Sequence, residues 1–360
     1  MPNINSSEGS RSGSGLLEAW SAVQTSLPSP WAKKLRVGAS AYEEIFTRGN
    51  ARFVKFTSKL EAPEKPEKKP EKKPETPVLI LPSLVNRHYI LDLLPGKSLV
   101  ESLLANRFPV YMIMWLNPPD EDRYLSIDDL FKLRILKAID VAAKNSPTGR
   151  VHLVGQCLGG TLASIAASLA PEKIESLSLL TAPIDFSHAG QLGAWANAPG
   201  FDLDALVDAH GNVPARFLQT SFQFLKPSSH FSKIKKIIER RKDEDFMVTF
   251  AAMELWSNDA VAFPGDCYRF LIRELYQRNQ LSEGSLQVCG KTISLRNTRF
   301  PILDAVATDD HIVPVCTRLN LNDRASITQL DLAGGHIGAV IGGHARKTFW
   351  PKWMSWLKSA

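Results

Sequence analysis

The segment Gly155-Gln156-Cys157-Leu158-Gly159-Gly160 constrains the fold of this chain more than any other part of the sequence. The apolar run 151–155 before it is typical of a buried strand, and the small residues of 161–170 after it are typical of a helix. A sharp strand-to-helix turn needs glycines near its central residue, because larger side chains there would clash. The context predicts a nucleophile elbow that carries Cys157 and disfavours the alternative, a buried structural cysteine.

From Val78 onward, apolar segments alternate with segments of helical periodicity. Strands are expected at 77–85, 109–115, 151–155, 176–183, 301–307 and 326–333, and helices at 96–107, 126–145, 161–170 and the C-terminus. This alternation is typical of a mostly parallel α/β sheet with helices on its faces. Together with the elbow, it predicts the α/β-hydrolase fold.

Composition divides the chain into five segments. Residues 1–60 are expected to be a Ser/Gly-rich tail followed by helical segments, and residues 61–77 a linker. The fold proper would then consist of 78–183, a helical cap at 184–290, and 291–360. The linker holds five prolines, five lysines and five glutamates. Its balanced charges and proline repeat predict an extended spacer that holds the preceding residues away from the active site.

The overall composition argues against several classes of protein. The net charge of +6 is a mild bias that does not indicate nucleic-acid binding, and no stretch approaches the roughly 18 apolar residues of a membrane helix. The polar start does not resemble a signal peptide. The four cysteines are scattered and form no CxxC pair, which favours a reducing, cytosolic compartment. We expect neither a metal nor a cofactor.

A nucleophilic cysteine requires a base and an orienting acid, and two later segments supply candidates. His336 follows two glycines after the last expected strand and is the best base. Asp309 and Asp310 follow the strand before it, and spacing alone does not decide between these two acids. His311 is the competing base, but it directly adjoins the acids and is a poor partner for them across a cleft. In α/β-hydrolases the order along the chain is nucleophile, acid, histidine.

From Val78 to the C-terminus the sequence resembles the polyhydroxyalkanoate synthases, in particular the short catalytic subunits of classes III and IV. The matching motifs come in the family's order: LVNRHYILDL (84–93), W-x-N-P (115–118), GQCLGG (155–160), PIDF (183–186), GNVP (211–214), FLIRELYQRNQL (270–281), DHIVP (310–314) and GGHIG (334–338). The resemblance implies Cys157 as nucleophile, His336 as base and Asp310 as acid. The oxyanion donors would be the N–H of Leu158, from the turn geometry, and the N–H of Val85, by family analogy.

The resemblance implies polymerisation of (R)-3-hydroxyacyl-CoA into a polyester through an acyl-cysteine, with coenzyme A as the leaving group. It also implies a cytoplasmic protein associated with polymer granules, a homodimer, and room for a second synthase subunit. A basic run in the cap is a candidate surface for the phosphates of coenzyme A, although a solvated helix face is the favoured interpretation. This run comprises Lys233, Lys235, Lys236, Arg240, Arg241 and Lys242.

Two other functions remain open from the sequence. A thioesterase or an intracellular polyester depolymerase with a cysteine nucleophile would share the fold, the triad and the substrate class. The fate of the acyl group, polymer or free acid, separates these enzymes from a synthase. A non-enzymatic granule-binding protein on a decayed fold is the third possibility, and the presence of all three triad candidates argues against it.

Overall fold

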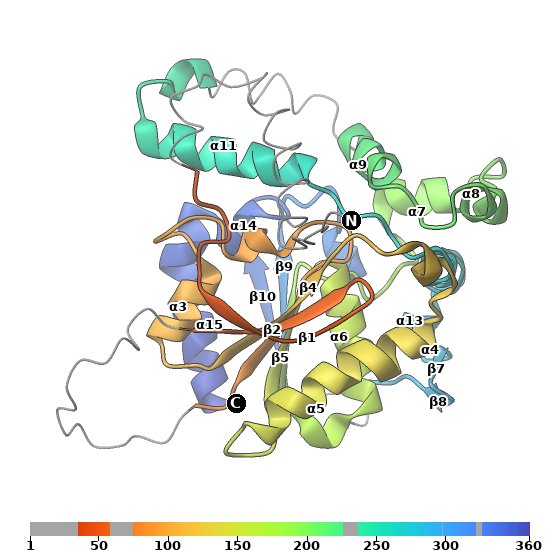
Figure 1. The fold of residues 1–360 in the computed structure, drawn as a ribbon, viewed down its shortest axis with the longest axis horizontal. Coiled ribbons are helices and arrows are strands. Elements are labelled where there is room, and N and C mark those ends of the chain that lie inside the picture. Colours follow the sequence, from red (N-terminus) through yellow and green to blue (C-terminus); the bar gives the residue numbers. More distant parts are fainter. Residues whose placement is uncertain (1–34, 58–74, 226–236, 297, 322–325) are drawn as a thin grey trace, which may run out of the picture.

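The computed structural model describes residues 35–57, 75–225, 237–296, 298–321 and 326–360. Within them, an eight-stranded sheet has the order β1-β2-β4-β3-β5-β6-β9-β10 (Figure 1). The strands are β1 (Tyr42–Arg48), β2 (Ala51–Phe56), β3 (Val78–Leu81), β4 (Val110–Trp115), β5 (Val151–Gln156), β6 (Ile174–Leu180), β9 (Ile302–Ala307) and β10 (Ile327–Leu332). From β4 to β10 all neighbours pair in parallel, whereas β1–β2 and β2–β4 are antiparallel. The mostly parallel sheet predicted from the sequence is confirmed.

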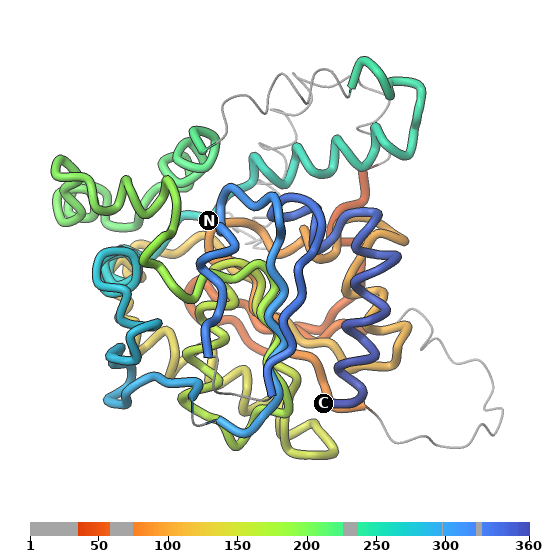
Figure 2. The backbone as a smooth tube through the Cα atoms, turned by 180° about the vertical axis from the view of Figure 1, so that it is seen from behind, coloured from red at the N-terminus to blue at the C-terminus, as the bar shows by residue number. Residues whose placement is uncertain are grey.

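Helices cover both faces of this sheet. The main ones around the core are α3 (Leu99–Ala105), α4 (Ile127–Leu130), α5 (Leu136–Lys144), α6 (Leu158–Leu169), α14 (Gly338–Ile341) and α15 (Gly343–Ser359). A π-helical turn (Phe131–Ile135) joins α4 to α5. Seen from behind, α3 and α15 run alongside each other on one face, and Ser102 Oγ of α3 lies 3.7 Å from Met354 Sδ of α15 (Figure 2).

The core consists of two apolar clusters, one on each face of the sheet. Successive side chains of a strand point to opposite faces, so Leu79 joins the cluster under α5 and α6 while Ile80 joins the cluster under α3 and α15. Both side chains are fully buried. Burial on both faces explains why β3, β4 and β5 are almost continuously apolar rather than alternating.

Residues 42–56 form a β-hairpin, so the prediction of helix for this part of 1–60 is wrong. β2 pairs with β4 along Ala51–Lys55, and Phe53 and Val54 are fully buried. β1 is exposed along most of its length, and its charged side chains resemble an exposed helix in the sequence. The position of this segment is set by pairing with β4, a strand more than fifty residues away. The hairpin is part of the sheet, so the expectation that a spacer separates the residues before it from the rest of the fold is wrong for 42–56.

The segment between β6 and β9 is largely helical. Its helices are α7 (Gly190–Ala196), α8 (Leu203–His210), α9 (Ala215–Phe224), α11 (Glu244–Asn258), α12 (Gly265–Phe270), a π-helix (Leu271–Gln277) and α13 (Gln280–Glu283), followed by the small hairpin β7 (Gln287–Val288) and β8 (Lys291–Thr292). In Figure 1, α7, α9 and α11 lie above one end of the sheet. The exact boundaries given above for the cap remain predictions.

Some of the sequence predictions concern residues outside the described part of the chain. These are the tail 1–34, most of the linker (58–74) and the cap lysines Lys233, Lys235 and Lys236.

None of the helices that the structure describes is both long enough and apolar enough to cross a membrane.

Removal of residues 1–77 should destabilise the protein, because it deletes β1 and β2 and exposes the edge of β4. Loss of the buried Phe53 and Phe56 alone removes contacts worth several kcal/mol, and an uncovered apolar strand edge promotes aggregation. We expect an insoluble chain or a melting temperature at least about 10 °C lower. Thermal melts of the 78–360 and 35–360 chains provide the comparison. Equal melting temperatures for the two would show that the hairpin adds nothing to the core.

Candidate active site

Cys157 lies on the strand-to-helix turn between β5 and α6, with the strained backbone that the elbow predicts. Its φ is 54° and its ψ is −132°, and its N–H donates to the Leu180 carbonyl at 3.0 Å. A Cβ on Gly155 would overlap Gly160, and one on Gly159 would overlap the backbone of Leu81. The glycines are therefore required, because they allow the turn to pack against the neighbouring strand and present the cysteine side chain.

Asp310 and His336 meet at the carboxyl ends of β9 and β10. His336 Nδ1 lies 2.7 Å from Asp310 Oδ2, and both residues are buried. The other carboxylate oxygen of Asp310 accepts from the N–H groups of Ile312 and Val313, each at 2.9 Å. These two backbone donors fix the carboxylate, which in turn orients the imidazole ring. The parallel sheet brings the two loops together because its strands all end at the same edge.

The structure separates the two acid candidates that spacing left open. Asp310 contacts His336, whereas Asp309 is exposed and its N–H bonds to the Gly334 carbonyl at 3.0 Å. The competing base His311 is exposed as well. Gly334, with φ of 111°, allows the loop after β10 to turn His336 back toward the cleft.

His336 has opposing influences on its pKa. Burial lowers the pKa, while the negative charge of Cys157 and hydrogen bonds to Asp310 and Cys157 raise it, with a net increase to about 10. The direction favours an imidazolium next to Cys157. A positive charge beside a cysteine suits a nucleophile, because the thiolate is in general the reactive form of that side chain. Because His336 interacts with both Cys157 and Asp310, the three side chains form one chemical unit.

The two residues predicted to supply oxyanion donors line the same cavity as Cys157. Leu158 begins α6, so its N–H has no acceptor within the helix and is available to an anion. Val85 lies in the loop after β3, and both residues line the cavity that contains Cys157. The N–H of Val85 donates to Ser83 Oγ at 3.3 Å, which is long for such a bond. The Val85 N–H is therefore held only weakly within its own loop.

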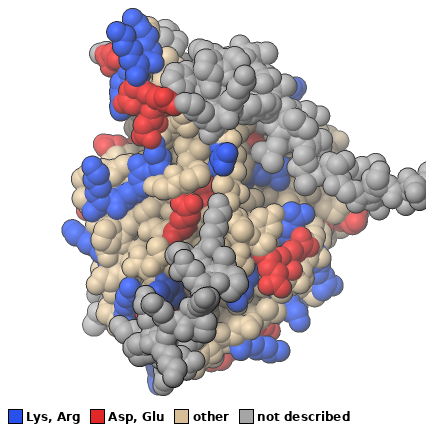
Figure 3. Space-filling view, turned by 60° about the vertical axis from the view of Figure 1, so that its left-hand side comes forward, with Lys and Arg blue, Asp and Glu red and all other residues tan. Residues whose placement is uncertain are grey.

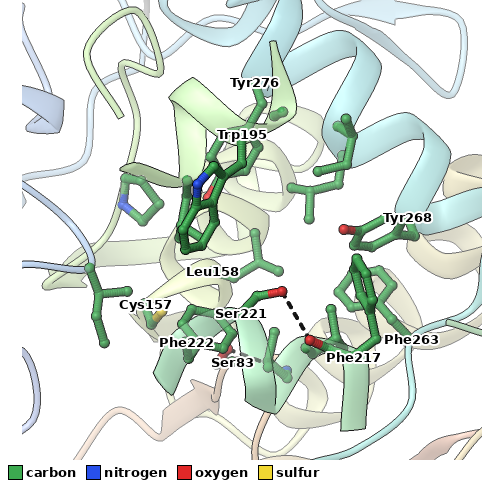
Figure 4. A pocket seen from close by; sticks show the side chains of 18 of the residues that line it. Ser83, Cys157, Leu158, Trp195, Phe217, Ser221, Phe222, Phe263, Tyr268 and Tyr276 are labelled. Atoms are coloured by element: carbon green, nitrogen blue, oxygen red, sulfur yellow. Dashed lines mark hydrogen bonds between the residues drawn. The ribbon is translucent and has the colours of Figure 1, made fainter. Parts of the chain in front are cut away.

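Two cavities meet at Cys157. The first, of about 120 Å³, is apolar and lies beneath the cap, where aromatic side chains such as Trp195, Phe263 and Tyr268 surround it (Figure 4). The second, of about 420 Å³, carries more polar groups, including His336. The sulfur thus lies between a small apolar chamber and a wider, more polar one.

Several residues at the site have no role predicted from the sequence. Tyr276 lines the apolar cavity, and burial followed by the nearby charge of Cys157 raises its pKa. Arg87 and Asp259 form an ion pair beside the Val85 loop, with Nε and Oδ1 3.1 Å apart. Tyr276 and Arg87 fall within the family motifs, so the sequence did contain a signal that could have pointed to these two residues. Nothing local marks Asp259, because its partner is 172 residues away.

The structure describes three residues of the basic run, Arg240, Arg241 and Lys242, and Arg240 is paired with an acidic side chain. Arg240 contacts Asp243 and lies over the ring of Phe246, 4.2 Å from its centroid. On the face drawn in Figure 3, Lys and Arg side chains lie interspersed with Asp and Glu among the described residues. The structure therefore adds no support for a phosphate-docking surface in Arg240, Arg241 and Lys242.

Comparison with known proteins first defines the class. Residues 76–340 match the family of the alpha/beta hydrolase fold. A solved structure of a lipase from Sulfolobus solfataricus aligns with a TM-score of 0.55 and 16% identity, covering 89% of this chain and 99% of that one. The chain therefore has the α/β-hydrolase fold that the elbow and the order of the triad candidates predicted.

The sequence relatives identify the family. The poly(3-hydroxyalkanoate) polymerase subunit PhaC of Thiocystis violacea is 32% identical over 91% of this chain and 90% of its own length. The corresponding subunit of Synechocystis sp. is 31% identical over 90% and 85%. That of Haloferax mediterranei is also 31% identical, but only 65% of its length is covered. The chain belongs to the poly(3-hydroxyalkanoate) polymerase family and is an enzyme of the acyltransferase type.

Asp310→Asn should reduce activity about 10³- to 10⁴-fold, because the amide no longer supports a positively charged His336 or fixes its tautomer. Asp309→Asn should change activity by no more than about twofold, since its side chain is exposed. Steady-state rates of the two purified variants make the comparison. A larger loss in Asp309→Asn would place the acid one residue earlier than the structure does.

Cys157→Ala should lower the pKa of His336 from about 10. The substitution removes the negative charge of Cys157, so that burial, which favours the neutral ring, is opposed by Asp310 without the help of Cys157. NMR titration of the ring protons measures the shift, and Cys316→Ala, at an exposed thiol, is the matched control. An unchanged pKa in Cys157→Ala would mean that the two side chains do not interact.

Proposed function

We propose that this enzyme polymerises (R)-3-hydroxyacyl-CoA into polyhydroxyalkanoate, with release of coenzyme A, through an acyl group carried on Cys157. The observation that supports this most is a thiol on the nucleophile elbow, coupled to the buried His336–Asp310 pair, in a member of the polymerase family. The proposed chemistry uses only side chains and backbone groups of this chain.

The first half of the proposed cycle transfers the acyl group. The sulfur of Cys157 attacks the thioester carbonyl, the bond to the sulfur of coenzyme A breaks, and His336 returns a proton to the leaving thiolate. One thioester replaces another, so the acyl group stays activated. The N–H groups of Leu158 and Val85 would stabilise the negative oxygen that forms between these states.

The second half forms the ester bond. The 3-hydroxyl of the next unit attacks the carbonyl carbon of acyl-Cys157 while His336 accepts the hydroxyl proton. The ester forms as the bond to sulfur breaks, and the proton held by His336 balances the thiolate that is regenerated. Water would compete with the hydroxyl. The apolar cavity beneath the cap favours the hydroxyl by limiting access of water to the acyl group.

The fate of the acyl group tests the proposed function. Purified enzyme with (R)-3-hydroxybutyryl-CoA should release coenzyme A and form insoluble polymer, and mass spectrometry of a stalled reaction should find the acyl adduct on the peptide that contains Cys157. Cys157→Ala should abolish both products, whereas Cys316→Ala should remain within a few-fold of wild type. Coenzyme A with equimolar free acid would instead favour the thioesterase. An adduct on another cysteine would remove Cys157 as the nucleophile.

We extend the proposal to the setting of the enzyme. Membership in a family that includes polymerase subunits supports assembly with a second synthase subunit, and the polyester product supports a location at polymer granules in the cytoplasm. A homodimer is the proposed oligomeric state.

A further inference from the structure

The loop that presents Val85 is attached to both the sheet and the cap. On the sheet side, Trp115 Nε1 donates to the Pro82 carbonyl at 3.0 Å. On the cap side, the segment that leaves α11 runs antiparallel to the loop: Val261 N–H donates to the Val85 carbonyl at 2.8 Å, and Asn86 bridges Ala260. The loop that carries the proposed oxyanion donor is therefore bonded directly to the segment that follows α11.

An ion pair reinforces this attachment. Arg87 Nε donates to Asp259 Oδ1 at 3.1 Å, and the two side chains are only 18% and 7% exposed. The second oxygen of Asp259 accepts from the Tyr89 hydroxyl at 3.1 Å. Trp256, in the last turn of α11, donates from Nε1 to the Arg87 carbonyl at 2.8 Å. Both ends of the Arg87 residue, backbone and guanidinium, are thus held by the end of the cap helix.

We infer that Asp259 is a positioning residue, which together with Arg87 holds the Val85 N–H where a substrate oxyanion replaces Ser83 Oγ. The inference rests on the proposed acyl transfer to Cys157. Asp259 itself touches neither Cys157 nor the reacting carbonyl. It acts through the loop, and so the cap contributes to the rate by fixing the oxyanion donor as well as by covering the cavity.

The Arg87–Asp259 ion pair makes the position of the Val85 N–H sensitive to substitution of Asp259. Removing the charge of Asp259 leaves a poorly solvated guanidinium without its counter-ion, held by a long hydrogen bond from Arg87 Nη1 to the Trp115 carbonyl (3.4 Å). We therefore expect Arg87 to move toward water. Because the Val85 N–H lies two residues from Arg87, the donor would shift with it. Loss of one oxyanion donor costs roughly 10²- to 10³-fold in rate, and a partial displacement should cost about 10- to 100-fold.

Two reactions of Cys157 distinguish positioning from general damage. Acylation by an ester or thioester needs the oxyanion donors, whereas alkylation by iodoacetamide has no oxyanion and needs only the thiolate. Asp259→Asn should slow acylation by p-nitrophenyl butyrate and by 3-hydroxybutyryl-CoA about 10- to 100-fold, and should leave the alkylation rate within about twofold. An equal loss in both reactions, or no loss in acylation, would overturn the inference.

The matched control is Asp122→Asn, because Asp122 forms another buried ion pair with arginine, 2.6 Å from Arg134, and holds the β-hairpin instead of the Val85 loop. It should lower the melting temperature and leave both reactions within about twofold of wild type. If this variant loses acylation as Asp259→Asn does, the effect is one of stability and the inference is wrong.

Trp256→Phe removes the hydrogen bond to the Arg87 carbonyl while keeping an aromatic ring, and it should lower acylation in the same direction if Asp259→Asn does not fold. Unchanged acylation in this variant would count against the cap attachment. The p-nitrophenyl ester separates this inference from the proposed function. Wild-type enzyme that reacts with the ester but not with the thioester would contradict the proposed function and still allow the variants to be compared.

Discussion

The strained turn at Cys157 is the constraint on which the rest of the site depends. A non-glycine residue with φ of 54° and ψ of −132° is costly, and it persists only because the surrounding structure holds it. Three contacts do so: the N–H of Cys157 bonds to the neighbouring strand β6, Gly155 lies against Gly160, and Gly159 lies against the end of β3. The geometry of the turn therefore depends on the register of the three central strands, β3, β5 and β6.

The same register determines how the catalytic candidates meet. β3, β5, β9 and β10 are parallel, so the loop that contains Val85, the turn at Cys157, and the loops that contain Asp310 and His336 leave the sheet at one edge. At that edge, Cys157, Asp310 and His336 interact electrostatically. Burial alone would keep His336 neutral, but Cys157 and Asp310 favour its charged form. The charge state of His336 thus depends on groups that follow three separate strands.

The cap adds a second constraint to this arrangement. It encloses a small apolar chamber beside the sulfur, which suits an acyl group that must avoid water. The segment that follows its helix α11 also pairs with the loop that contains Val85. The cap thus covers the cavity beside Cys157 and also holds the loop of Val85, the oxyanion donor proposed here.

Local sequence determined the elbow, the central strands and the narrow choice of acid and base, because these depend on glycine positions, apolar runs and strand ends that neighbouring residues reveal. It left Asp309 and Asp310 equivalent until the family motif selected one, and the contact with His336 then came from the fold. It failed for residues 42–56, where charged residues mimic a helix and only pairing with β4 makes a strand. The Arg87–Asp259 pair likewise joins residues 172 positions apart. Such pairings depend on which surfaces the folded sheet brings together, and no local periodicity contains that information.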